Sequence, residues 1–283
     1  MFVRTMQEIG TVPPGPLLVF GGPYSNLQAT RAIRQTAKRL GIAPERCICT
    51  GDIVGYCADP MDTIAEIRDW GCHVIAGNVE RQLAEGALDC GCGFDAGTTC
   101  DRLAAGWYTH ANAHVDRAAR DWMAGLPDVL RLSTEWGDLY VVHGGTTHVN
   151  RFVWPTATDG ALLGEIGEFQ QGLAGGNTDP AAILAGHSGI AFRRDLAGTA
   201  WINAGVIGLP PNDGAPATRY CILYPDGRSE IGRLDYDFEA AASAMEAAGL
   251  TQGYHRALRS GWWPSEDILP PDLRRQAQSL ASG

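Results

Sequence analysis

Four segments of the sequence carry side chains that bind divalent metals, and each segment follows an apolar run. The side chains are Asp52, Asn78, His143 and His187, in the pairs Gly-Asp, Gly-Asn, His-Gly and Gly-His. A carboxylate, an amide and two imidazoles suit a borderline divalent ion such as Mn²⁺, Fe²⁺ or Zn²⁺ better than Ca²⁺. The alternative is structural, because Asp and Asn also satisfy the backbone of turns at strand ends.

The elements that must position these side chains alternate between two kinds. Short apolar runs predict strands over residues 17–20, 46–50, 73–76, 139–142 and 182–185. Helical spacing of apolar residues over 26–40, and a helix start at Asp59-Pro60, predict helices between the first three strands. This alternation predicts a parallel sheet, which presents its chemistry at the carboxyl ends of the strands.

The length allows one large domain or two small ones, and the lack of an internal repeat or a linker-like segment predicts one domain over residues 1–283, with a leader over 1–16 and a helical C-terminal extension over about 238–283. The formal net charge of −10 makes a nucleic-acid partner a poor fit, since such a surface is basic. No apolar run reaches the ~20 residues of a membrane span. The first residues lack the apolar core of a signal peptide, which predicts a cytoplasmic location. The sequence leaves the oligomeric state open.

The four segments together resemble those of the calcineurin-like metallophosphoesterases. The match is to a small bacterial branch with a Gly-Asp-Ile-Val-Gly-Tyr segment followed by Asp-Pro, which stands here at residues 51–60. The resemblance extends from about Leu17 to Leu234 with the segments in order. It implies an α/β fold, a four-layer α/β/β/α sandwich in which two mixed sheets pack face to face. It also implies hydrolysis of phosphate esters at a pair of metal ions.

The resemblance implies that Asp52, Asn78, His143 and His187 form the complete protein shell of one metal ion. The shell of the second ion is largely missing. The Asp-x-His of the first strand is replaced by Gly22-Pro23-Tyr24, and the second histidine of Gly-His-x-His is replaced by Gly189. The histidine that protonates the leaving group is replaced by Val79. We therefore expect one conventional ion.

Several residues near these segments are predicted to act on the substrate. Tyr24 is a nucleophile, a donor to a phosphoryl oxygen or a phenolate ligand, unless it only fills the volume of the missing metal. Glu80 is an acid, a base or a ligand-orienting group, unless it is a solvated charge at a helix start. Arg151 and His148 are predicted to contact phosphate, Arg151 because its guanidinium is bidentate. Asn26, in an Asn-Leu pair matched by the family, is predicted to contact substrate as well.

The cysteines suggest a replacement for the missing ion. Cys57 follows the Asp52 segment, and Cys90, Cys92 and Cys100 follow Asn78 with a C-x-C-x7-C spacing. These thiols predict a second, thiolate-ligated metal or a redox-linked pair. Loop packing or a disulfide is the alternative.

Two functions remain in competition. The first is a hydrolase with one conventional metal ion that acts on a small phosphorylated molecule. Its substrate would need little protonation of the leaving group, because Val79 cannot donate a proton. The second is a non-catalytic descendant that keeps the fold and binds a metal or another ligand, as a pseudoenzyme or a redox or metal sensor.

Overall fold

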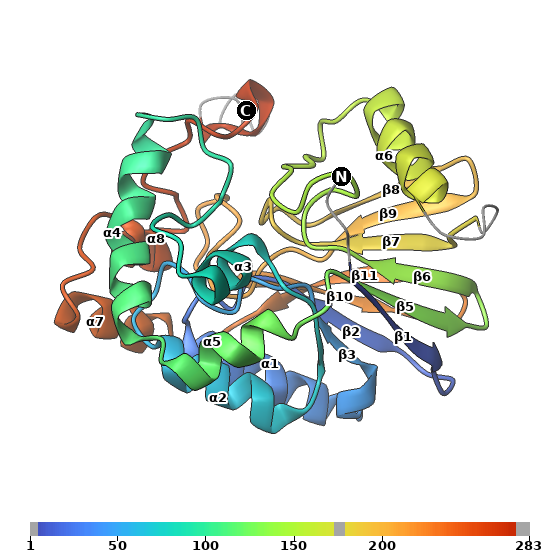
Figure 1. Cartoon of the computed structure of the whole chain (residues 1–283), viewed down its shortest axis with the longest axis horizontal. Helices are drawn as coiled ribbons and strands as arrows, with labels where there is room; N and C mark the ends of the chain where they lie inside the picture. Colours follow the sequence, from blue (N-terminus) through green and yellow to red (C-terminus); the bar gives the residue numbers. More distant parts are fainter. Residues whose placement is uncertain (1–4, 173–178, 276–283) are drawn as a thin grey trace.

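Two β-sheets pack face to face, with helices on both outer surfaces (Figure 1). The computed structural model describes residues 5–172 and 179–275. One sheet has the strand order β11 (Ser229–Leu234), β10 (Thr218–Leu223), β2 (Leu17–Phe20), β3 (Cys47–Cys49) and β4 (His73–Val74). The other has the order β1 (Met6–Thr11), β5 (Val129–Thr134), β6 (Gly137–Val141), β7 (Ala182–Ala185), β9 (Thr199–Asn203) and β8 (Phe192–Leu196). Both sheets mix parallel and antiparallel pairs.

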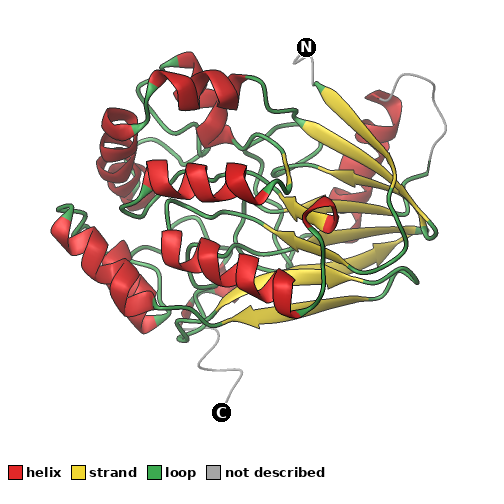
Figure 2. Ribbon diagram, turned by 90° about the horizontal axis from the view of Figure 1, so that it is seen from below, coloured by secondary structure: helices red, strands yellow, loops and turns green. Residues whose placement is uncertain are grey.

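Helices make up the two outer layers, and Figure 2 shows them outside the strands. The layer against the five-stranded sheet includes α1 (Leu27–Arg39) and α2 (Pro60–Trp70), and α6 (Asp159–Gly172) covers the six-stranded sheet (Figure 1). The remaining helices are α3 (Asn78–Glu85), α4 (Thr99–His114), α5 (Arg117–Ala124), α7 (Phe238–Ala247) and α8 (Tyr254–Ser260). The α/β/β/α sandwich expected from the sequence is confirmed. No described helix is both long and apolar enough to cross a membrane.

The strands are continuous apolar runs because both faces of each sheet are covered. In β2, Leu17 and Val19 belong to the cluster between the sheets, whereas Leu18 and Phe20 belong to the cluster under the helices. Successive side chains of a strand point to opposite faces, so a strand buried on both sides requires apolar residues at every position. The inter-sheet cluster includes residues from both sheets, among them Ile48 of β3 and Leu184 of β7.

Local signals fix the ends of the helices that were predicted. The side chain of Asn26 accepts a hydrogen bond from the Ala29 amide and caps α1. Pro60 occupies the first turn of α2, and Gly71 ends that helix with φ of 74°. A left-handed residue directly after a helix favours glycine, which carries no Cβ. These boundaries agree with the sequence.

The leader is the clearest correction to the predicted organisation. Residues 6–11 form β1, which pairs in parallel with β5 at the edge of the six-stranded sheet. Most of its side chains are exposed, so the strand has no apolar alternation that the sequence could reveal. The predicted C-terminal helices are α7 and α8, and residues 276–283 of that extension lie outside the described part of the chain.

The inter-sheet cluster predicts a large cost for a cavity at its centre. Leu184 is fully buried, so Leu184→Ala should lower the free energy of unfolding by about 2–5 kcal/mol. Leu88 is 92% exposed, so the matched Leu88→Ala variant should change it by less than about 0.5 kcal/mol. Urea unfolding followed by circular dichroism measures both. Equal effects would contradict the assignment of Leu184 to the core.

Candidate metal centre

The predicted metal ligands meet where the carboxyl ends of the two sheets come together. Asp52 and Asn78 follow β3 and β4 of one sheet, and His143 and His187 follow β6 and β7 of the other. All four residues are less than 8% exposed. The side-chain ligand atoms of Asp52, His143 and His187 lie within 4.8 Å of one another. Residues from distant parts of the chain therefore form one compact cluster.

The spacing of the ligand atoms fits a single ion. Nε2 of His143 lies 3.1 Å from Oδ1 of Asn78 and 3.1 Å from Nδ1 of His187. It lies 3.2 Å from Oδ2 of Asp52, which is 3.9 Å from Nδ1 of His187. Tetrahedral ligands at about 2.0–2.2 Å from a metal are separated by roughly 3.3–3.6 Å. The observed separations bracket that range.

Hydrogen bonds behind the cluster turn electron pairs toward its centre. Nδ1 of His143 lies 2.6 Å from the Thr50 carbonyl, so the neutral ring keeps its proton there and directs the Nε2 lone pair inward. The amide nitrogen of Asn78 donates to the Cys90 carbonyl at 2.9 Å, which directs Oδ1 inward. These lone pairs repel one another and the Asp52 carboxylate unless a metal ion, or a proton on Nε2 of His143, lies between them. The donor set therefore fits a metal ion.

The charges of the cluster agree with metal ligation. Burial opposes ionisation of Asp52, but His143 and His187 outweigh it and hold the pKa of this carboxyl well below its usual range. Burial and the neighbouring His143 lower the pKa of His187, so this imidazole is neutral at pH 7. Burial acts in the same direction on His143, but Asp52 outweighs it and raises the pKa of that ring. An anionic carboxylate beside a neutral imidazole is a metal-binding combination.

Glu80 holds the Asp52 loop in place. Its carboxylate is fully buried and accepts hydrogen bonds from the amides of Asp52, Ile53 and Gly77, each at 2.8 Å. Asp52 has a φ of 55°, which residues with a side chain rarely adopt, and these bonds stabilise it. Burial and the Asp52 charge raise the pKa of Glu80 to about 7. The alternative of a solvated charge is wrong, and the contacts give Glu80 a positioning role.

Tyr24 fills the space beside the cluster where a histidine was missing. Its ring lies in a gap left by Gly22, Gly55 and Gly208, where any Cβ would come within 2.8 Å of the tyrosine. The ring packs edge-on against Tyr56 with centroids 4.7 Å apart. Burial and the Asp52 charge raise the pKa of Tyr24 well above its usual value, so the phenol keeps its proton at neutral pH. A protonated, buried phenol favours space filling over a phenolate ligand.

Of the two predicted substrate contacts after His143, Arg151 pairs with a carboxylate of the protein and His148 is exposed. Nε of Arg151 lies 2.6 Å from Oε1 of Glu165, a buried carboxylate that also accepts from the Thr146 amide. Glu165 was missed in the sequence because its partners are about 15–20 residues away, and it anchors the loop after His143. His148 is exposed, and its carbonyl closes a turn of that loop.

Asn26 is also committed to the fold rather than open to a substrate. It is fully buried, caps α1 and donates to the Gly208 carbonyl at 3.0 Å. Its two polar groups are therefore both satisfied. The prediction that Asn26 contacts substrate is not supported by this geometry.

The four cysteines do not form a thiolate metal site. Cys90 and Cys92 form a disulfide, which was the alternative given by the sequence. Sγ of Cys57 faces the Gly208 carbonyl, and Sγ of Cys100 faces the Ser265 hydroxyl at 3.5 Å. Within residues 5–172 and 179–275, the metal-binding cluster contains no cysteine. Sγ of Cys92 instead lies 3.5 Å from the amide nitrogen of Asn78, on the side away from the centre.

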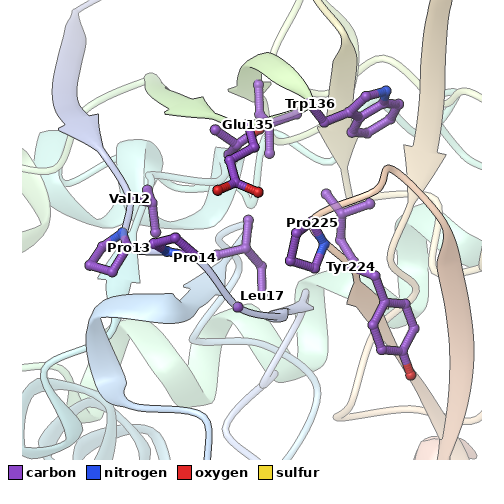
Figure 3. Close-up of a pocket in the computed structure, with 12 residues that line it drawn as sticks. Val12, Pro13, Pro14, Leu17, Glu135, Trp136, Tyr224 and Pro225 are labelled. Carbon is purple, nitrogen blue, oxygen red and sulfur yellow. The ribbon is translucent and has the colours of Figure 1, made fainter.

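Figure 3 shows a different pocket, whose lining residues place it at the end of the sandwich opposite the metal-binding cluster. It opens at the amino ends of β2 and β6, and its volume is about 20 Å³. Its lining is apolar apart from Glu135 and Thr134, and it includes Val12, Pro14 and Trp136. It lacks a ligand set like that of the metal centre, so the chemistry is assigned to the carboxyl ends.

Known proteins share this fold. No family model matches the chain. An uncharacterized protein of Methanocaldococcus jannaschii is 25% identical over 244 residues, which cover 80% of this chain and 89% of the relative. The crystal structure of a metallophosphoesterase from Sphaerobacter thermophilus aligns with a TM-score of 0.65 and 22% identity, over 88% of this chain and 100% of the other. The crystal structure of a hypothetical protein from Pyrococcus horikoshii aligns with a TM-score of 0.71 and 15% identity, over 87% of this chain and 98% of the other. The chain has the fold of the metallophosphoesterases.

The role of Glu80 is testable by an isosteric change. Glu80→Gln places an NH₂ group against backbone N–H donors, which should lower the free energy of unfolding by about 1–3 kcal/mol. It should also weaken metal binding by about 10–100-fold, because Asp52 loses its support. Thermal unfolding and isothermal titration with Mn²⁺ measure the two effects. Glu168→Gln on the exposed face of α6 is the matched control and should change neither quantity. Unchanged metal affinity in Glu80→Gln would refute the positioning role.

Proposed function

We propose that the protein is a phosphoric ester hydrolase that uses one divalent transition metal ion. The convergence of four buried acceptor atoms from four strand-end loops carries this proposal. The alternative of turn stabilisation explains less, because it does not require four side-chain ligand atoms from separate loops to converge on one point. Mn²⁺, Fe²⁺ and Zn²⁺ suit this mixture of oxygen and nitrogen ligands.

A divalent cation supplies Lewis acidity, which lowers the pKa of water and polarises a phosphoryl oxygen. The residues of the chain hold the ligands ready for it. Thr50 fixes the tautomer of His143, and Glu80 fixes the backbone of Asp52. The amide of Val79, in the first turn of α3, donates to Oδ1 of Asp52 at 3.3 Å and leaves Oδ2 for the cluster. Preorganisation of this kind lowers the cost of binding.

Two positions favour one ion rather than two. Tyr24 is buried and keeps its proton at neutral pH, and Gly189 has no side chain. The carboxylate of Glu80 accepts backbone hydrogen bonds with both oxygens, so it is not free to ligate.

The position that donates a proton in the resembling family lacks an acid here. The side chain of Val79 is buried and has no acidic proton to give to a leaving group. These features support a substrate whose leaving group departs without a strong acid.

A non-catalytic metal-binding protein is the second candidate function. The absence of a proton donor at Val79 and of ligands at Tyr24 and Gly189 favours it. The same four ligands would hold the ion in both cases. The two functions therefore differ in turnover and not in metal content.

Asp52→Asn separates these functions. The variant loses the anionic ligand and should bind metal at least about 100-fold more weakly than the parent. Elemental analysis of protein purified without chelator should find about one ion per chain in the parent, since one ligand set is complete. Turnover of a panel of phosphomonoesters and phosphodiesters should fall with the metal content. Asp62→Asn, at an exposed position of α2, is the matched control and should keep the metal content and the turnover of the parent.

Each outcome has a distinct meaning. Metal without Asp52-dependent turnover would contradict hydrolysis and support the non-catalytic function. A metal-free parent that also binds no added Mn²⁺ would contradict both functions.

A further inference from the structure

An aromatic pocket adjoins the metal centre. His187 is part of both, because it ligates on one side and lines the pocket on the other. The space open to water-sized atoms is about 40 Å³, roughly three times what one water molecule needs. Its walls include Tyr24, Tyr56, Phe94, Phe152, Tyr254 and Trp263.

The walls of the pocket are held in place by their own contacts. Tyr56 packs against Tyr24, Trp107 and Tyr254 with ring centroids 4.6–4.8 Å apart. Phe152 lies over His187 with centroids 4.3 Å apart. Such aromatic pairs are stabilised by both burial and ring geometry. The inner walls are therefore preformed.

The rim is provided by a segment near the C-terminus. The indole nitrogen of Trp263 donates to the Pro210 carbonyl at 2.7 Å, and its amide donates to Asn212 at 2.7 Å. Trp263, Phe94 and Phe152 are only partly buried, so the pocket is bounded by solvent on this side. A ligand can enter between these rings.

The chemistry of the lining restricts the ligand. No Asp, Glu, Lys or Arg lines this pocket in the described part of the chain. The polar groups that do line it are hydroxyls, a thiol and the imidazole of His187. A charged group would lose its hydration here without a partner, which is costly. A flat, uncharged ring suits aromatic walls and the small volume.

The position of the pocket links it to the missing metal ligands. Tyr24 and Gly189 stand at two of the three positions that lack a metal-binding side chain, the third being Gly22, and both line the pocket. A Cβ on Gly189 would lie 3.6 Å from the Trp263 ring, so a larger side chain there would extend into this space. The side of the centre that lacks ligands is therefore apolar and open to an organic group.

We propose that this pocket binds the aryl group of the substrate, which makes the substrate a small aryl phosphate ester. The proposal deepens the proposed function and rests on it. In the reaction, the oxygen of water bonds to phosphorus and the bond from phosphorus to the aryl oxygen breaks. The electron pair of that bond leaves with the aryl oxide. The products are a phenol and phosphate, and the proton lost by water is taken up by them or by solvent.

An aryl leaving group also fits the lack of an acid at Val79. A phenol has a pKa of about 10, as in tyrosine. An alkoxide is about as basic as hydroxide, since water has a pKa of about 15.7. A phenolate therefore departs without prior protonation far more readily than an alkoxide.

Ligand binding tests the pocket without reference to activity. Fluorine NMR titration of the metal-loaded protein with 4-fluorophenol should show saturable binding. Phe152→Ala removes one wall, and Cys100→Met fills space at the wall beside Ser265. Each should weaken binding by about tenfold, which corresponds to roughly 1.4 kcal/mol. Phe238→Ala is the matched control, since Phe238 does not line the pocket.

Kinetics then connect the pocket to the reaction. The ratio of kcat/KM for phenyl phosphate to that for ethyl phosphate should fall by about tenfold in Cys100→Met, with metal content unchanged. Absence of saturable 4-fluorophenol binding, or equal binding in Cys100→Met and the parent, would overturn the aryl pocket even if esters are hydrolysed. Binding that responds to these variants without any Asp52-dependent turnover would overturn the hydrolase and leave aryl binding in place.

Discussion

The carboxylate of Glu80 holds together the two loops that place Asp52 and Asn78. It accepts hydrogen bonds from amides on both sides of the gap between the ends of β3 and β4. Without these bonds, the positive φ of Asp52 would cost free energy that the loop alone does not recover. The metal ligands of the other sheet are fixed in a similar way, by Thr50 behind His143 and by Glu165 beneath the following loop.

The centre is therefore asymmetric in its chemistry. One side presents a carboxylate, an amide and two imidazoles whose electron pairs converge. The other side presents tyrosines, phenylalanines and a glycine, and no Asp, Glu, Lys or Arg is among the described residues that line it. In the proposed function, an ion and a phosphoryl group occupy the first side, because their charges need partners. The proposed aryl group occupies the second, where burial of apolar surface is favourable.

The sequence predicted the parts of this arrangement that leave a local pattern. Strands such as β2 and β7 were found because burial on both faces makes them apolar at every position. The four candidate ligands were singled out because a family resemblance marks each one next to a glycine, and the fold brings them together. For Glu80 the sequence left open an acid, a base, a ligand-orienting group or a solvated charge, and Glu165 was missed, because both roles depend on backbone amides that only the tertiary fold brings near. The exposed edge strand β1 has no apolar pattern, so it was taken for a leader.

The central claim is that one ion binds at one intact ligand set. Anomalous X-ray scattering from a crystal of protein loaded with Mn²⁺ tests it most directly. The account predicts a single peak at about 2.0–2.3 Å from the ligand atoms of Asp52, Asn78, His143 and His187. A second peak beside Tyr24 and Gly189, or no peak at the four ligands, would contradict it.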